Sequence, residues 1–319
     1  MHGLARIAMN GRFRALLLSV ACFGSLLFAW IGAAIVALVT LRKGVQEGIW
    51  LLLWAGLPVL ILTRVTGDGS SLALLLGTSL LALVLRETVS LSLPALSSVG
   101  VALLTGFGLL LFGQSLLVDL AALFEQFFAS LQAQAQTQAQ GLGTQALTLA
   151  VPSTVQLAGL MGTTNGAMCF LCIALARYWQ ASLFNPGGFG SEFRELRISR
   201  TMVFVLLLAG LAVASSGLAG RAWATAALIP LTIAGFALLH ARAHQRSQGS
   251  FGLSLIYATW VVFDAVKLVL VGFVVADALL DFRSRWAGRG GPGNEQGTGE
   301  GTGEGGNGAE DPERDDDSR

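Results

Sequence analysis

Two charged residues interrupt an otherwise apolar segment near the end of the chain. Asp264 and Lys267 lie within the run 252–280, and their spacing of three residues places them on one face of a helix. Charges inside a membrane span are costly, so such residues are paired, functional, or both. Two interpretations are open: a self-neutralised pair buried between helices, or a polar group that lines a cavity for a substrate or an ion.

A second polar group opens the apolar segment 153–178. The stretch MGTTNGAMCF places two threonines and Asn165 between glycines. Small and polar residues let helices approach closely and hydrogen-bond to one another, and the same residues can line a pocket. We therefore expect either close helix packing or a ligand pocket here, and the candidate pocket residues are Thr164, Asn165, Tyr257, Asp264 and Lys267.

Other reactive side chains point to no chemistry. Cys169 and Cys172 form a CxxC pair, but apolar residues surround them, whereas redox pairs need an electropositive setting that stabilises the thiolate. His240 and His244 have a spacing that can bind a metal, but no acidic or cysteine ligand lies nearby in the sequence. With no nucleophile elbow, Walker loop or dinucleotide fingerprint, we expect no catalysis, no metal and no cofactor.

The composition is that of a membrane protein. Of 319 residues, 54% are hydrophobic and only 12% are charged, whereas soluble domains are about 25% charged. So few charges cannot cover the surface of a soluble enzyme, and a net charge of +1 does not suit a nucleic-acid binder. The lipid bilayer is therefore the expected environment.

The last part of the chain differs sharply from the rest. Residues 287–319 contain a GTGEGTGE repeat, nine of the 19 acidic residues and almost no apolar side chains. Such a segment cannot offset the entropy of ordering, which predicts a disordered, Gly-rich acidic tail. Residues 1–286 remain as a net-basic transmembrane helical domain.

Apolar runs long enough to cross a bilayer recur along this domain. They predict an all-α, polytopic transmembrane bundle of about eight spans, roughly six to nine, at 15–41, 46–63, 71–86, 93–118, 153–178, 201–219, 223–241 and 252–280. The run 15–41 is long for one span and short for two, so a kinked pair and a short hairpin are both open. The final run is longer than a simple span requires.

The loop charges predict an orientation. Arg42, Lys43, Arg86 and Arg177 belong to one set of loops, which the positive-inside rule assigns to the cytoplasm together with the loop 179–200. The opposite set contains few basic residues. These features predict a multi-pass protein of a bacterial inner membrane.

One long connection, 119–148, is not uniformly apolar. Its first part has an oily helical face suited to the membrane interface, and its second part alternates Gln with Ala or Thr. We expect an extracytoplasmic connector, helical or flexible.

The most distinctive stretch is ARYWQASLFNPGGFGSEFRELRISR at 176–200. Its NPGG sequence predicts a turn, because Pro fixes φ and Gly permits positive φ, and the residues after it predict a short amphipathic helix on the membrane surface. A structural turn and a docking surface are both open. The candidate partner-contact residues here are Asn185, Pro186, Gly187, Gly188, Phe189, Glu192, Arg194 and Arg197.

A ridge of small residues, Ala29, Ala33 and Ala37, lies on one face of a predicted helix. Such ridges allow tight helix association, either within the bundle or with a partner helix.

The segment RYWQASLFNPGGFGSEFRELR resembles the signature of the YybS-like family of predicted bacterial integral membrane proteins, which carry a domain of unknown function. AIVALVTLRKG and VVADALLDFRSR are similar to the same pattern, and the resemblance covers roughly residues 12–285. It implies a fold similar to the S components of energy-coupling-factor transporters, which capture small molecules. In those proteins an Ala-x-x-x-Ala ridge contacts the coupling subunit, so the resemblance implies that Ala29, Ala33 and Ala37 do so here, with an ATPase as a further partner.

Two functions therefore remain open. The first is a small-molecule-binding transport component. The alternative is a non-transporting membrane scaffold or interaction protein in cell-envelope or division processes, acting through the loop at 177–200. Neither function involves nucleic acid, and the sequence does not specify an oligomeric state.

Overall fold

The computed structural model describes residues 2–25, 27–142, 150–246 and 250–283. The chain divides into two units, Met1–Phe282 and Arg283–Arg319, and the helices belong to the first. Its described residues form helices and turns, with no strand, which confirms the all-α class. The predicted acidic tail, 287–319, lies outside the described residues.

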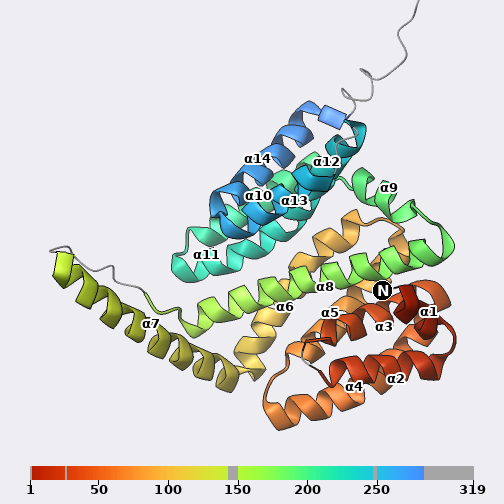
Figure 1. The fold of residues 1–319 in the computed structure, drawn as a ribbon, viewed down its shortest axis with the longest axis horizontal. Coiled ribbons are helices and arrows are strands. Elements are labelled where there is room, and N and C mark those ends of the chain that lie inside the picture. The colour runs from red at the N-terminus through yellow and green to blue at the C-terminus, as the bar shows by residue number, and fades with distance from the viewer. Residues whose placement is uncertain (1, 26, 143–149, 247–249, 284–319) are drawn as a thin grey trace, which may run out of the picture. The chain divides into compact units, whose positions relative to one another are not determined.

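The order of the helices along the chain can be followed in Figure 1. In chain order they are α1 (His2–Met9), α2 (Arg12–Phe23), α3 (Ala29–Lys43), α4 (Val45–Thr66), α5 (Ser70–Thr88), α6 (Ser92–Phe112), α7 (Gln114–Leu142), α8 (Thr154–Phe184), α9 (Gly188–Glu195), α10 (Arg200–Ala214), α11 (Leu218–Ala224), the 3-10 turn η1 (Thr225–Ala227), α12 (Leu228–Gln245), α13 (Ser250–Val262) and α14 (Asp264–Leu280).

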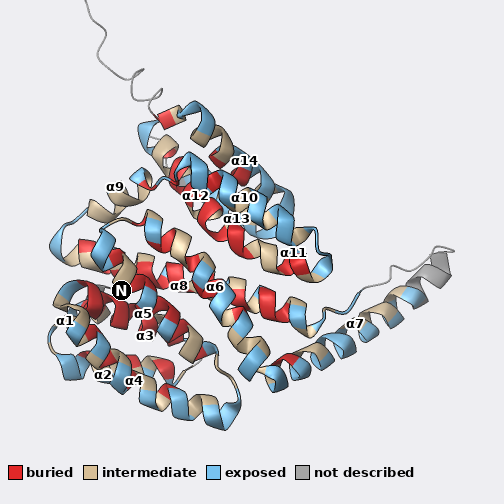
Figure 2. Ribbon diagram, turned by 180° about the vertical axis from the view of Figure 1, so that it is seen from behind, coloured by how far each residue is buried: buried red, intermediate tan, exposed pale blue. Residues whose placement is uncertain are grey.

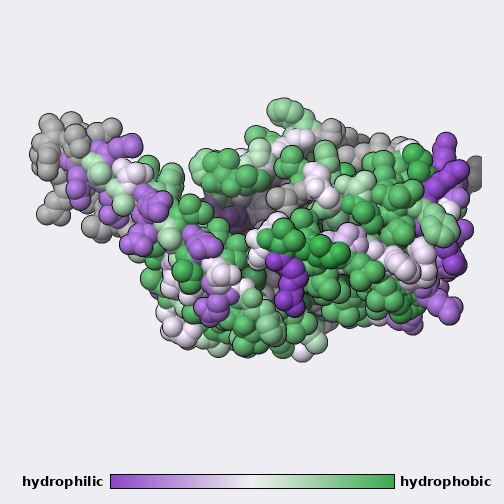
Figure 3. Space-filling model, turned by 90° about the horizontal axis from the view of Figure 1, so that it is seen from below, coloured by the Kyte–Doolittle hydropathy of each residue, from purple (hydrophilic) through white to green (hydrophobic). Residues whose placement is uncertain are grey.

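Several of the helices have the length and composition of membrane spans. Six described segments are long and apolar enough to cross a bilayer, and the number rises to eight if α9 with α10 and α13 with α14 each form one bent span. The expectation of about eight spans is therefore confirmed. Apolar side chains cover most of the face in Figure 3, as expected of a surface that lipid surrounds.

The first apolar run forms two helices rather than one span. α2 ends at Phe23, α3 begins at Ala29, and the two pack against each other. A Cβ atom at Gly32 would lie 3.0 Å from the Phe23 ring, so the glycine admits this close approach. Of the two open alternatives, the short hairpin is the one that forms.

The last apolar run is broken. α13 ends at Val262 and α14 begins at Asp264, with a bend of 120° between them. Phe263 has an extended backbone, with φ −115° and ψ 114°, and it therefore cannot continue the helix. The acidic side chain of Asp264 then stands in the first turn of α14, where the helix dipole favours negative charge.

The predicted connector, 119–148, is helical over its described residues. α6 ends at Phe112, and after Gly113 a single helix, α7, includes the first part of the segment 119–148. Ala and Gln are good helix formers, so the helix continues through the Gln-Ala repeat. Its apolar part, Gln114–Gln136, is itself one of the candidate spans, and only 6% of it is buried. Residues 143–148 of the connector lie outside the described residues.

The core lies where α3, α5 and α8 meet, and Figure 2 shows buried residues concentrated on these helices. Small residues also set the contact between α6 and α8. A Cβ atom at Gly162 would lie 2.4 Å from the Ala102 carbonyl oxygen, and one at Gly166 would lie 2.6 Å from that of Ser98. The glycines of the MGTTNGAM stretch therefore let the two backbones touch.

Candidate functional site

Asp264 and Lys267 form the predicted pair. The Lys267 Nζ donates to Asp264 Oδ1 at 2.6 Å, and it lies 5.7 Å from the centroid of the Trp260 ring. The Asp264 side chain, however, is 94% exposed and that of Lys267 is 38% exposed. The expected burial between helices is therefore wrong, because the break at Phe263 moves the pair from the middle of a span to a helix start.

Tyr257 belongs to an aromatic cluster between α12 and α13. Its ring stacks on Phe236 with the centroids 4.5 Å apart, and it lies 6.0 Å from the His240 ring. Trp260 packs edge-on against Phe236 at 5.4 Å. Tyr257 thus joins two helices.

The polar residues of α8 bind to neighbouring helices. Asn165 Nδ2 donates to Thr105 Oγ1 on α6 at 2.9 Å, and the Thr163 and Thr225 hydroxyls are 2.9 Å apart. Thr164 is exposed and donates to the Leu160 carbonyl oxygen within its own helix. For Thr163 and Asn165, the expectation of interhelical hydrogen bonds is confirmed.

Neither of the two cavities among the described residues brings the five candidate pocket residues together. The described part of the chain has two cavities of interest, and neither is lined by Tyr257, Asp264 or Lys267. Asn165 lies behind the wall of one of them, through its bond to Thr105. The bent α13–α14 pair packs on α12, away from the Asn165–Thr105 contact, so the five residues belong to two different parts of the bundle.

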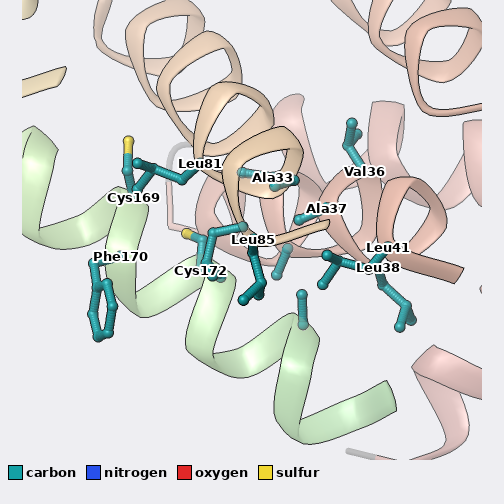
Figure 4. Packing of buried hydrophobic residues seen from close by; sticks show 14 of the residues in the cluster. Ala33, Val36, Ala37, Leu38, Leu41, Leu81, Leu85, Cys169, Phe170 and Cys172 are labelled. Atoms are coloured by element: carbon teal, nitrogen blue, oxygen red, sulfur yellow. The ribbon is translucent and has the colours of Figure 1, made fainter. Parts of the chain in front are cut away.

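The alanine ridge lies inside the bundle. Ala29 is 6% exposed, and Ala33 and Ala37 are fully buried against α5 and α8. Figure 4 shows Ala33 and Ala37 in the same cluster as Leu85 and Cys172. Internal packing is therefore confirmed, and this face offers no surface to a partner helix.

The two α8 cysteines are part of that core. Cys169 and Cys172 are buried, and their Sγ atoms lie 3.7 Å from the Leu74 carbonyl oxygen and 3.4 Å from that of Trp30. Both lie within close-packed helices, which agrees with the predicted structural role. No described group of three or more His, Cys, Asp or Glu residues could hold a metal ion.

The NPGG sequence forms the predicted turn between α8 and α9. Gly187 adopts φ 88°, a conformation that favours glycine, and the Gly188 amide donates to the Asn185 carbonyl oxygen at 3.0 Å. Asn185, Pro186 and Gly187 are exposed, so they form the tip of the loop.

Aromatic contacts and ion pairs hold α9 against the bundle. Phe189 stacks near Phe193, and Phe193 packs edge-on against the His240 ring at 5.4 Å. At the end of the loop, Arg197 Nη1 lies 2.8 Å from Asp281 Oδ1, while the half-buried Arg194 lies beside Gly190.

The first cavity lies where α9 meets the ends of α3, α5 and α8. Arg177 Nε bonds Glu192 Oε2 at 2.7 Å, and Arg177 Nη1 bonds Gln180 Oε1 at 2.8 Å. From α5, Arg86 Nη1 donates to the carbonyl oxygens of Thr40 and Leu41 at 3.1 and 2.9 Å. The cavity between these groups has a volume of about 460 Å³. Its polar lining comes from Arg86, Glu87, Arg177, Gln180 and Glu192, and Leu41 and Leu85 form an apolar floor. We call this the polar cavity.

The second cavity is an apolar groove of about 470 Å³ along α5 and α6. Its lining also includes Gly67 and Gly69, in the turn before α5, and Gly113, which follows α6. Leu76, Leu80 and Leu104 supply apolar walls, and Thr105 supplies a hydroxyl. The sequence patterns do not predict this site. Its only signal is the presence of glycines within apolar helices, such as Gly108, where a Cβ atom would meet no neighbouring atom within 4 Å.

Comparison with protein-family models, with curated proteins and with solved structures finds no match to this chain.

Proposed function

We propose that this chain is a multi-pass membrane protein that binds a small, largely apolar molecule as a transport component. The apolar groove carries the proposal. Its volume of about 470 Å³ falls within the range of about 300–1,000 Å³ that is usual for ligand sites. Such sites combine apolar walls with a few placed polar groups, as the leucines and Thr105 do here.

The polar group in the groove favours a ligand with an acceptor atom. Asn165 Nδ2 donates to Thr105 Oγ1, so the Thr105 hydroxyl hydrogen is left to be donated outward. An apolar molecule with one carbonyl, hydroxyl or ether oxygen would satisfy this donor. The long-range bond from α8 would also fix the orientation of the hydroxyl.

The lining of the groove reaches the turn that contains Gly67 and Gly69, before α5, and Gly113, after α6. The loop charges assign this end to the extracytoplasmic side of a bacterial inner membrane. Capture from that side suits uptake, with the energy supplied by a coupling subunit and an ATPase. Because the alanine ridge is buried, the surface that such a subunit would meet includes exposed apolar residues, for example Leu53 and Ile61 on α4.

Filling the groove tests the proposal. Leu76 lines the groove and is 51% exposed, so Leu76→Trp should occupy the groove without entering the core. Wild-type and variant chains would be purified in parallel, and their organic extracts compared by mass spectrometry. We expect an apolar compound in the wild-type extract to fall by about tenfold or more, equivalent to at least 1.4 kcal/mol of binding free energy.

The matched control is Leu57→Trp on α4, which is 52% exposed and does not line the groove. Its extract should match that of the wild type. Identical extracts from all three chains would contradict small-molecule binding in the groove.

The scaffold function is a second candidate, and the loop at 177–200 favours it. The ion pairs Arg177–Glu192 and Arg197–Asp281 hold α9, while Asn185 stands exposed at the tip. A held, exposed tip suits docking of a cytoplasmic partner. Capture of the full chain from native membranes separates the two functions: an ATPase and a coupling subunit support transport, whereas envelope or division proteins support the scaffold.

A further inference from the structure

We propose that the polar cavity binds the headgroup of a zwitterionic phospholipid that has a primary ammonium group, as phosphatidylethanolamine does. The cavity is lined by two guanidinium groups, from Arg86 and Arg177, and by two carboxylates, from Glu87 and Glu192. Its formal charge is therefore balanced, and the ligand that matches it carries both signs.

The guanidinium groups supply donors for a phosphate. Arg86 uses Nη1 on the Thr40 and Leu41 carbonyl oxygens, and Arg177 uses Nε and Nη1 on Glu192 and Gln180. Among the described residues, no hydrogen bond engages Nη2 of either arginine. These bonds hold both side chains in place, and the remaining N–H groups can bind phosphate oxygens.

The acceptor for the ammonium group is Glu87. Glu192 is neutralised by Arg177 at 2.7 Å, whereas no described residue bonds or pairs with the exposed Glu87 carboxylate. A primary ammonium can donate hydrogen bonds to a carboxylate, but a quaternary ammonium has no N–H to donate. An anionic headgroup would instead bring a further negative charge toward Glu87, which disfavours it.

The position of the cavity suits a lipid. It lies near the C-terminal ends of α5 and α8, two candidate spans, where spanning helices leave the hydrocarbon. Leu41 and Leu85 form its buried floor, and Val89 at its edge is 73% exposed, which gives an acyl chain an apolar exit. This site is separate from the apolar groove, so lipid binding here does not depend on the proposed transport function.

Lipid competition measures the headgroup preference. The full chain in detergent would be incubated with equimolar dioleoyl-phosphatidylethanolamine, dioleoyl-phosphatidylcholine and dioleoyl-phosphatidylglycerol, and retained lipid counted by native mass spectrometry. We expect phosphatidylethanolamine to exceed each of the others by about fivefold, the upper end for a partly exposed ion pair. Glu87→Gln should abolish the preference over phosphatidylcholine.

The control variant is Glu195→Gln on α9, which is exposed and does not line the cavity, and it should keep the preference. Arg86→Gln should lower retention of all three lipids; should it fail to fold, Glu87→Gln decides, because the Glu87 side chain makes no bond to a described residue. Equal retention of phosphatidylethanolamine and phosphatidylcholine, or an unchanged preference in Glu87→Gln, would overturn the proposal. Displacement of the lipid by inorganic phosphate at equal concentration would also overturn it, in favour of a free-phosphate site.

Discussion

At the scale of single residues, ion pairs that join two elements differ from ion pairs formed within one helix. Arg177 and Glu192 are mostly buried side chains that join α8 to α9, with 26% and 20% exposed. Asp264 and Lys267 pair within one helix and leave Asp264 almost fully exposed. The first pair therefore shapes the polar cavity, whereas exposed pairs of the second kind contribute little to stability.

Removing Arg177 should loosen α9. Arg177→Ala strands Glu192 and Gln180 at once, so we expect a loss of about 1–3 kcal/mol in the free energy of unfolding. Thermal unfolding in detergent, followed by circular dichroism, measures the loss. The control is Arg64→Ala, because Arg64 is exposed and makes no bond to another described residue. Equal melting temperatures for the two variants would show that Arg177 does not hold α9.

At the scale of elements, small residues decide which helices touch. α8 passes α6 with Gly162 and Gly166 against the α6 backbone, and Ala33 and Ala37 bring α3 into the core. Polar residues then act between helices: Asn165 reaches Thr105 only because the glycines allow the approach.

A larger residue at this crossing should push α6 away. At Gly166, a Cβ atom would already lie 2.8 Å from that of Ala102, so Gly166→Val is expected to cost about 1–3 kcal/mol or more. Asn165 precedes Gly166 and donates to Thr105, which lines the apolar groove. The variant should therefore also weaken ligand binding in the groove. The control is Gly100→Val on α6, where a Cβ atom would meet no other atom within 4 Å. A Gly166→Val protein as stable as Gly100→Val would refute the tight α6–α8 contact.

At the scale of the whole molecule, the sequence predicts the features that a lipid bilayer requires of any chain that crosses it, namely helices of sufficient length. A run of about 20 apolar residues must form a helix in lipid, so the class and most of the spans could be predicted. The candidate span within α7 is instead predicted to be a connector, and the run 15–41 forms two helices. The break at Phe263 could not be predicted, because neither Gly nor Pro stands there to mark it. Two contacts also could not be predicted: that of Asn165 with Thr105 and that of Arg86 with α3. Each joins residues that are far apart in the chain, and no local sequence pattern indicates such a contact.

If the proposed function is correct, the apolar groove holds a small molecule rather than bulk lipid. A photoreactive side chain placed at Leu76 in the full chain, and irradiated in native membranes, tests it most directly, with the same group at Leu57 as the comparison. Mass spectrometry of the adducts should reveal at position 76 a discrete small compound that is absent at position 57. The same mixture of lipid adducts at both positions would contradict the claim.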